Sequence, residues 1–339
     1  MSRLEFSRFN AQFTAASSPA RLGAPMSTQP GLSAAAAEMI FARGTAVSPV
    51  ARPARSLWGR TTSSPFPVSI VVREGELGGK TSVGASGGVA REFVAKLAEQ
   101  SLQHRAVNHP YLEALGSGNL PDMHWALADF GRHYHGYSKE FPRYLTAVIS
   151  RLEDPSHRAG LMENLTEESG VYEAEELAKL DEIGIESDWI VDKPHPVLFT
   201  RFCKAMGVDD EDLLDVSDQV VCWREMFLSL LTAGTPAEAV GALGLGTENI
   251  VSTIYQPFCS AVDGLSELSP RDTVFFPLHT AVDDHHQETL QGIAADLAVD
   301  EDSRSKLRLG MLKALSLRSS FWDWMYSRAL SPQTADQIL

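Results

Sequence analysis

The sequence predicts an all-α fold, a bundle of roughly seven to nine helices. From Val89 onward, apolar residues recur every three or four positions through long segments, which is the period of an amphipathic helix. Short polar breaks, many with Gly or Pro, separate these segments. The alternation of apolar and polar residues that is typical of strands is nearly absent. Together these observations favour helices that pack around a shared core.

The first expected helices precede residue 150. Arg91–Arg105 forms one of them, and a much longer helix opens at Leu120-Pro121-Asp122, because proline is tolerated in a first turn. The apolar stripe of this long helix continues to Ile149. Pro142 lies inside the stripe, so we expect a kink there.

The remaining helices are separated by one unusual segment. Asp154-Pro155 begins the next helix, and a strongly acidic stretch, 171–193, follows it. Further helices are expected at about 196–206, 210–232, 235–242, 247–262, 277–297 and 302–328. The apolar side of the last one consists of Leu307, Met311, Leu315, Trp322 and Met325.

Residues 1–85 differ from the rest of the chain in composition. They carry 9 Lys and Arg against 4 Asp and Glu, whereas the other residues carry 20 against 40. The segment is rich in Ala, Ser, Arg, Pro and Gly, so it cannot bury enough apolar surface to offset the entropy of ordering its backbone. We interpret it as a disordered leader before a domain of residues 86–339. An organelle transit peptide and an inert extension stay open, and Val68–Val72 could form a lone strand.

Charge and cysteine content exclude several classes. The net charge of −15 argues against sequence-independent binding of nucleic acid. No stretch approaches about 18 uninterrupted apolar residues, so no membrane span is expected. Cys203, Cys222 and Cys259 lack C-x-x-C spacing and have apolar neighbours, which indicates buried thiols in a reducing interior. We therefore expect a cytoplasmic protein, or an organellar one if residues 1–85 are a transit peptide.

A metal-binding pattern lies in the segment 275–286. In a helix that begins near Pro277, the side chains of His279, Asp283 and His286 fall at positions i, i+4 and i+7, on one stripe. Two imidazoles and a carboxylate form half of a site for a first-row metal, most naturally iron or manganese. Asp284 and His285 fall off this stripe. A solvated acidic helix is the plain alternative.

Carboxylates on other helices would complete such a site. An oxygen-activating pair of irons needs about six or seven ligands. Glu168 shares the apolar stripe of Leu161 and Leu165, where a carboxylate is costly unless it is paired or bound to a cation. Its neighbour Glu167 is expected to point about 100° away. The alternative to a metal ligand is that Glu168 is simply a carboxylate at the end of a helix.

Three more candidates come from separate segments. His195 lies just before an apolar helix, where it could instead be a packing residue. Glu248 is expected to head a helix, and its alternative role is stabilisation of the helix dipole, with Thr247 as N-cap. Glu140 lies next to Phe141 near the inward stripe, and an exposed pair with Lys139 is its alternative.

Five motifs together carry a resemblance to a known family. They are Asn108-His109-Pro110-Tyr111-Leu112, Phe141-Pro142-x-Tyr144-Leu145, Asn164-Leu165-x-Glu167-Glu168-x-Gly170, His195-Pro196-x-Leu198-Phe199 and His279-x-x-x-Asp283-x-x-His286. Over about residues 105–330, the chain resembles the haem-oxygenase-like di-iron oxidases, or iron-containing redox enzymes. The resemblance implies an up-and-down bundle of about seven core helices without haem, two Fe²⁺ ions, and O₂ as co-substrate.

The resemblance also implies a set of metal ligands. These are Glu168, His195, Glu248, His279, Asp283 and His286, with Glu140 as a tentative seventh, and no catalytic residue is expected beyond them. In the family, the glutamate and histidine that match Glu168 and His195 are closer in sequence. The acidic insert 171–193 must therefore loop out and return His195 to the site.

The expected chemistry is oxidation of a small organic substrate. Glu140 and the insert favour the N-oxygenase branch, which converts an amine or guanidine-type nitrogen. Oxidative C–C cleavage, decarboxylation or desaturation of an amino or fatty acid needs the same ligands and stays open. A tentative apolar substrate pocket consists of Tyr134, Tyr137, Phe141, Tyr255 and Phe258.

Other classes of function remain as alternatives. A metal-free thiaminase-type bundle would use a cysteine nucleophile, a true haem oxygenase would use His104 or His109, and an interaction bundle would leave the histidines exposed. The expected partner is a small-molecule substrate, without nucleic acid. A reductase or other external electron donor, and a homodimeric assembly, stay open.

Overall fold

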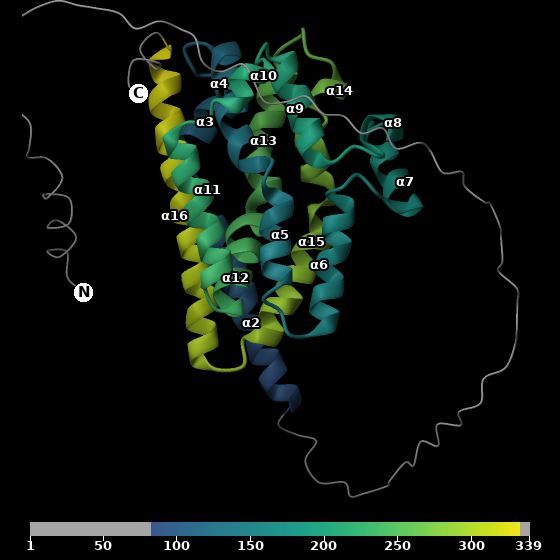
Figure 1. Ribbon diagram of the computed structural model, residues 1–339, viewed down its shortest axis with the longest axis vertical. Helices are drawn as coiled ribbons and strands as arrows, with labels where there is room; N and C mark the ends of the chain where they lie inside the picture. Colours follow the sequence, from purple (N-terminus) through teal and green to yellow (C-terminus); the bar gives the residue numbers. More distant parts are fainter. Residues whose placement is uncertain (1–82, 333–339) are drawn as a thin grey trace, which may run out of the picture. The chain divides into compact units, whose positions relative to one another are not determined.

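The computed structural model describes residues 83–332, except for the side chains of residues 83–86 and 282–285. The prediction of an all-α bundle is confirmed, since every element in this range is a helix (Figure 1). The elements are α2 (Val83–Leu102), α3 (Pro110–Gly116), α4 (Met123–Ser138), α5 (Phe141–Ile149), α6 (Pro155–Glu167), α7 (Ala174–Glu182), α8 (Ser187–Ile190), α9 (His195–Ala205), α10 (Asp210–Leu214), α11 (Asp218–Ala233), α12 (Pro236–Val240), the π-helix η1 (Gly241–Glu248), α13 (Asn249–Asp263), α14 (Pro270–Thr273), α15 (Phe275–Leu297) and α16 (Glu301–Leu330).

Helix α15 contacts most of the segments in which ligands are predicted. It contacts α6, α9, η1 and α13, while α16 packs along η1, α12 and α11 on another side of the bundle. Figure 1 shows the long α15 and α16 running through the bundle beside the shorter helices. The core between them is largely aromatic: the Phe130 ring centroid lies 4.2 Å from that of Phe258, and Phe258 stacks on Phe276 at 5.3 Å.

Two predicted long helices are broken in the structure. The one expected from Leu120 to Ile149 is divided into α4 and α5, because the chain turns at Lys139 and Glu140 and Pro142 takes a first-turn position of α5. The prediction of a kink inside one helix is therefore wrong. The helix expected at 210–232 is likewise divided into α10 and α11.

Two other predicted helices are joined instead. The segments expected at 235–242 and 247–262 form one continuous run, α12–η1–α13, in which Gly241–Glu248 has π-helical geometry. The glycines of this run allow very close packing: a Cβ atom at Gly241 would collide with the Leu307 carbonyl of α16. A Cβ atom at Gly246 would lie only 2.9 Å from the Met311 carbonyl. Glycine is therefore required for this approach of α16 to the run.

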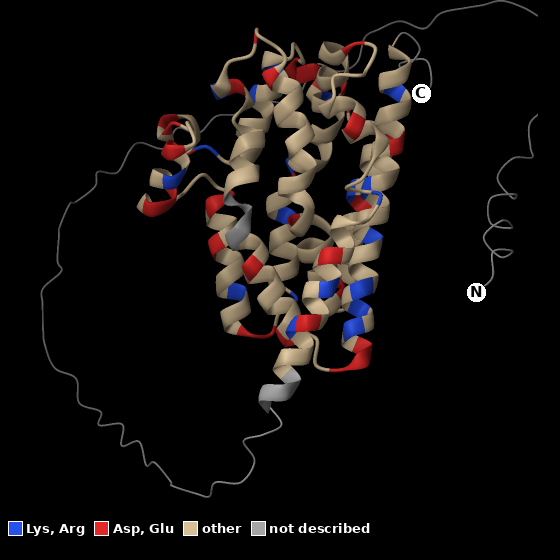
Figure 2. Ribbon diagram, turned by 180° about the vertical axis from the view of Figure 1, so that it is seen from behind, with Lys and Arg blue, Asp and Glu red and all other residues tan. Residues whose placement is uncertain are grey.

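The acidic insert leaves the bundle as predicted, but it is helical rather than a loop. Helices α7 and α8 project beside the bundle in Figure 1, and Figure 2 marks their acidic residues in red along the ribbon. The insert begins at Gly170, whose φ is +85°, and a Cβ atom there would lie 2.5 Å from the Lys193 nitrogen. The chain returns through backbone bonds from Asp192 N to Gly170 O and from His195 N to Glu168 O.

The N-terminal predictions fall mostly outside the described residues. These are the disordered leader and the lone strand at Val68–Val72. The first described helix, α2, ends at Leu102 and does not extend to Arg105 as predicted. Within residues 83–332, none of the helices is both long enough and apolar enough to be a membrane span.

Candidate metal centre

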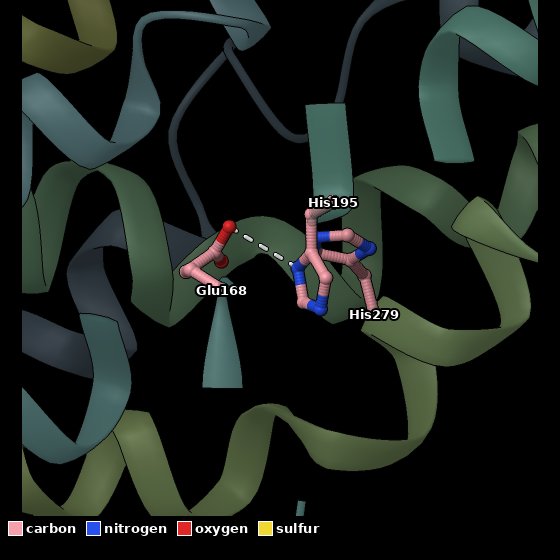
Figure 3. A group of neighbouring side chains, drawn as sticks. All are labelled: Glu168, His195 and His279. Carbon is pink, nitrogen blue, oxygen red and sulfur yellow. Dashed lines mark ion pairs between the residues drawn. The ribbon is translucent and has the colours of Figure 1, made fainter. Parts of the chain in front are cut away.

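Three of the predicted ligands converge on one point. Glu168 caps the C-terminus of α6, His195 is the first residue of α9, and His279 lies in α15. One ligand atom from each lies within 4.8 Å of the other two. The Nδ1 atom of His195 is 3.1 Å from Oε2 of Glu168, and the two imidazole centroids are 4.7 Å apart (Figure 3). Glu168 and His195 are buried, so this group does not belong to the solvated surface.

The stem of the insert holds His195 in place. Its backbone N–H donates to the Glu168 carbonyl at 3.0 Å. Tyr172, at the start of the insert, lies with its hydroxyl 2.7 Å from Nε2 of His195. The imidazole is thus fixed on one side by Tyr172 and directs Nδ1 toward Glu168. Such a partner on the second ring nitrogen is typical of metal-binding histidines.

His279 is oriented by its own helix. Its Nδ1 lies 2.6 Å from the Phe275 carbonyl oxygen one turn earlier, which leaves Nε2 for other contacts. Burial lowers the pKa of His279 to about 3. The ring is therefore neutral at physiological pH, which is the form that binds metal ions. Burial alone would raise the pKa of Glu168, but the adjacent His195 outweighs it and lowers that pKa below its ordinary value, so Glu168 is ionised.

A second carboxylate–histidine contact lies beside the first. Nε2 of His286 is 2.7 Å from Oε2 of Glu167, and both side chains are buried. Burial opposes a charge on His286, but the hydrogen bond to Glu167 and the charges of Glu248 and Glu168 raise its pKa to about 9. The prediction that Glu167 points away from the site is wrong. Helix α6 ends at Glu167, so helical spacing does not describe Glu168, the next residue.

Glu248 reaches the same region from η1. It is 4% exposed, and its Oε1 has no hydrogen-bond partner among the described residues. Burial raises its pKa to about 7. The alternative with Thr247 as N-cap is not observed, because the π-helical segment continues into α13 and the Thr247 hydroxyl donates to the Ala242 carbonyl at 3.1 Å. A buried carboxylate with a free oxygen fits a cation ligand.

Two predicted ligands remain, of which the structure describes the side chain of one. The side chain of Asp283 lies outside the described residues, as do those of Asp284 and His285. Glu140 is described, and the structure places it elsewhere: its carboxylate pairs with Nη1 of Arg143 at 2.7 Å just ahead of α5. The alternative pairing with Lys139 is not what is observed either.

A small cavity of about 40 Å³ adjoins the candidate ligands. Glu168, His195, Glu248 and His279 are part of its lining. Four of the five predicted pocket residues line it as well, namely Tyr134, Tyr137, Phe141 and Tyr255. Phe258 is absent from the lining and packs in the aromatic core instead. Sequence analysis did not single out Arg318, which also lines the cavity.

The residues behind the alternative functions lie elsewhere. None of the three cysteines lines this cavity, and burial raises the pKa of Cys203 above its usual range and that of Cys259 to about 11. Cys222 is exposed, so the prediction of a buried thiol is wrong there. His109 caps α3, and its Nε2 is 3.3 Å from Asp323. Nδ1 of His104 accepts from the Ala106 N–H. None of these residues forms a second candidate site.

Comparison with known proteins assigns the family. The model of a family described as iron-containing redox enzymes matches residues 128–319, more than half of the chain. The chain belongs to the iron-containing redox enzyme family. The resemblance in the five sequence motifs is thereby confirmed.

The relatives of known name are distant in sequence. A 4-aminobenzoate synthase from Chlamydia muridarum is 22% identical over 64% of this chain and 83% of its own length. A 4-chloro-allylglycine synthase from Streptantibioticus cattleyicolor is 23% identical over 69% of this chain and 82% of its own.

Solved structures confirm the predicted haem-oxygenase-like fold. A CADD-like protein of unknown function from Nostoc punctiforme has a TM-score of 0.56 at 17% identity, covering 73% of this chain and 98% of its own. A domain of unknown function with a haem-oxygenase-like fold from Shewanella denitrificans has a TM-score of 0.53 at 15% identity, covering 73% and 95%. At these identities the likeness concerns the fold alone.

Proposed function

We propose that this protein is a di-iron, O₂-dependent oxidoreductase that oxidises a small organic substrate in the cavity beside Glu168. The observation that carries the proposal is the convergence of Glu168, His195 and His279 within 4.8 Å, from three separate segments, in the wall of that cavity. Carboxylate and imidazole donors in this mixture suit iron. Family membership supports iron as the metal.

The remaining polar groups fit a second ion beside the first. Glu248 has a buried oxygen without a partner, and His286 and Glu167 lie beside it in a mutual contact. Together with Asp283 of the sequence motif, these residues would complete about six or seven ligands. Bound ferrous ions would supply the electrons that reduce dioxygen.

The protein's own groups prepare the site for metal. Tyr172 and the Phe275 carbonyl hold the imidazoles of His195 and His279 in fixed orientations. A metal ion would displace the protons held by Glu248 and His286, so its affinity rises with pH. Phe141 and Phe275 contribute apolar surface to the cavity, which limits the water around a bound substrate.

Within this reaction class, we favour N-oxygenation of an amine or guanidine-type nitrogen. The support comes from the insert 171–193 and from the relative named 4-aminobenzoate synthase, whose product carries a nitrogen substituent. Glu140 no longer supports this choice, because it pairs with Arg143 outside the cavity. A second candidate is oxidative C–C cleavage or desaturation, since another relative is named for an allylglycine product, which contains a C=C bond.

The test is anaerobic reconstitution with ferrous iron, followed by metal analysis and exposure to oxygen. We expect about two irons per chain and a transient visible absorption band after oxygen is added. His279→Ala and Glu168→Gln should lose most of the iron and the band. His124→Asn is the matched control, because His124 is exposed on α4 and should leave both unchanged. A wild-type chain that retains no iron after gel filtration would refute the proposal.

A further inference from the structure

Arg318 is a buried cation in the wall of the substrate cavity. It lies in α16, is 2% exposed, and shares the lining with Glu168, His195 and His279. A guanidinium group stays charged at any physiological pH and carries five N–H donors. Its position at the cavity therefore raises the question of what balances this charge.

The described contacts of Arg318 are all with neutral groups. Its Nη1 and Nη2 atoms donate to the hydroxyls of Tyr134 and Tyr137, each at a long 3.4 Å. The guanidinium carbon also lies 5.4 Å from the Trp223 ring centroid and 5.5 Å from that of Tyr137. Among acidic side chains that the structure describes, none forms an ion pair with Arg318. Aromatic rings orient the guanidinium, but they do not neutralise it.

A second arginine of the same helix shows what a compensated charge looks like in this protein. Arg328 is 4% exposed, and its Nε and Nη2 atoms bind the two carboxylate oxygens of Asp129 at 2.8 and 2.7 Å. Such a bidentate pair offsets the cost of removing both charges from water. Arg318 is equally buried and lacks this arrangement, but it lines the cavity.

The cavity limits the chemistry of that ligand. The cavity is small, and Val251, Phe275 and Tyr255 give it apolar walls. A single guanidinium matches the charge and the planar fork of one carboxylate, whereas a phosphate dianion would need further cations. Glu168 and Glu248, which are candidate metal ligands, also line the cavity.

We propose that Arg318 binds a carboxylate group of the substrate, so that the substrates are small organic carboxylates. This inference rests on the proposed function, in which the oxidised atom of the same substrate faces Glu168, His195 and His279. Arg318 then anchors one end of the molecule, and Tyr134 and Tyr137 hold the guanidinium in position.

The test is calorimetric binding to the metal-free protein with two matched probe pairs, benzoate against benzamide and hexanoate against hexanamide. The wild type should bind each carboxylate at least about tenfold more tightly than its amide, because a charge-assisted bidentate contact is lost in the amide. Arg318→Met should remove this preference. Arg308→Met, an exposed arginine of the same helix, should leave it unchanged.

Several outcomes would overturn the proposal. If the wild type binds each acid and its amide equally, the proposal is refuted without any variant. It is also refuted if Arg318→Met has wild-type helicity and still binds the acids more tightly than the amides. If Arg318→Met does not fold, Arg318→Gln and Arg318→Lys replace it, and only the lysine variant should keep part of the preference. A preference that appears only after Mn²⁺ is added would assign the carboxylate to the metal instead. Iron loading of Arg318→Met, measured separately, should stay at the wild-type level. Failure of the di-iron proposal would appear in the iron content, and failure of the carboxylate proposal would appear in the binding preference.

Discussion

The Asp129–Arg328 ion pair joins α4 to the C-terminal part of α16 inside the bundle. Both side chains are buried, and His133 adds a third group, with Nε2 3.3 Å from Oδ1 of Asp129. Burial alone would raise the pKa of Asp129, but Arg328 and His133 outweigh it and lower that pKa below its ordinary value of 3.8. The pair therefore stabilises the fold only while Asp129 is ionised.

Removing one charge of this pair should strongly destabilise the protein. Asp129→Asn leaves Arg328 without its carboxylate, and we expect the free energy of unfolding to fall by about 3–5 kcal/mol in urea titrations at pH 7. Asp296→Asn is the control, because the Asp296 side chain is 70% exposed and its contact with His157 should contribute less than about 1 kcal/mol. Equal effects of the two substitutions would contradict this assignment.

The same pair predicts a pH dependence. Because the folded-state pKa of Asp129 is depressed, its contribution is complete above the ordinary value of 3.8 and is lost as the pH falls below it. The difference in unfolding free energy between wild type and Asp129→Asn should thus be largest near neutrality and shrink in acid. Urea titrations between pH 3 and pH 7 measure it, and a difference that grows in acid would be inconsistent.

At this scale, sequence reasoning reached some side chains and missed others. Glu168 was selected because it shares the stripe of Leu161, yet that spacing was extended past the end of α6 and wrongly excluded Glu167. The glycine at position 170 was the available sequence signal, because helices often end at a glycine with a positive φ, as Gly170 has here. Arg318 could have been found as well, because it lies three residues after Leu315 and four before Trp322 on the buried stripe of α16.

At the scale of elements, the tightest packing is that of α16 against α12 and η1. Gly310 of α16 faces the Glu238 carbonyl, and a Cβ atom there would overlap that carbonyl. Both sides of this contact are backbone, so neither can move aside as a flexible side chain would. The position of Glu248 at the end of η1 depends on this contact, because η1 packs against the same helix.

A pair of glycine substitutions tests this interface. Gly310→Ala should lower the free energy of unfolding by about 1–3 kcal/mol or more, because the added methyl group forces α16 away from α12. Gly292→Ala is the matched control in α15, where no atom lies within 4 Å of the added methyl group. It should raise the free energy of unfolding by up to about 1 kcal/mol, because alanine has a higher helix propensity than glycine by about this amount. Urea titrations of both variants measure the effect, and a loss of stability in Gly292→Ala would refute the packing argument.

The presence of a helix was easier to predict than the residues at which it begins and ends. The apolar period of α15 and α16 is long, so both were expected at nearly the observed bounds. Local periodicity could not predict that α12, η1 and α13 form one run, because the π-helical geometry arises where glycines let α16 approach. Gly244 and Gly246 read as breaks in the sequence, although in the structure they are helical contact positions.

On the scale of the whole molecule, the described candidate ligands all lie between Glu167 and His286. They come from α6, α9, η1 and α15, so the site exists only when the bundle is assembled. All described residues belong to a single compact unit. None of the contacts described for the site requires the preceding residues.

Removal of residues 1–73 should therefore leave the metal centre intact. A chain that begins at Glu74 should keep the same helices as the full chain, as judged by circular dichroism. Its iron content after anaerobic reconstitution should equal that of the full chain. Inductively coupled plasma spectrometry gives the iron content. A loss of more than half of the iron, with helicity unchanged, would show that the first segment takes part in the site.

The fold class was accessible from the sequence because periodicity and the order of motifs act over the whole chain. The way in which His195 returns to Glu168 was not, because 26 positions separate them and only the folded stem brings them together. The two ends of the insert are held together by backbone hydrogen bonds such as that from Asp192 N to Gly170 O. The pattern of residues along the sequence does not indicate such bonds.

The closed stem at Gly170 and Lys193 has an evolutionary consequence. Because the entropy of closing a loop grows only with the logarithm of its length, chain can be added or deleted beyond the stem at small cost. The backbone bond from His195 to Glu168 lies on the bundle side of this junction, and Tyr172 lies directly next to it at the start of the insert. The projecting hairpin is therefore a place where descendants of this gene can acquire new surface while inheriting the same ligand geometry.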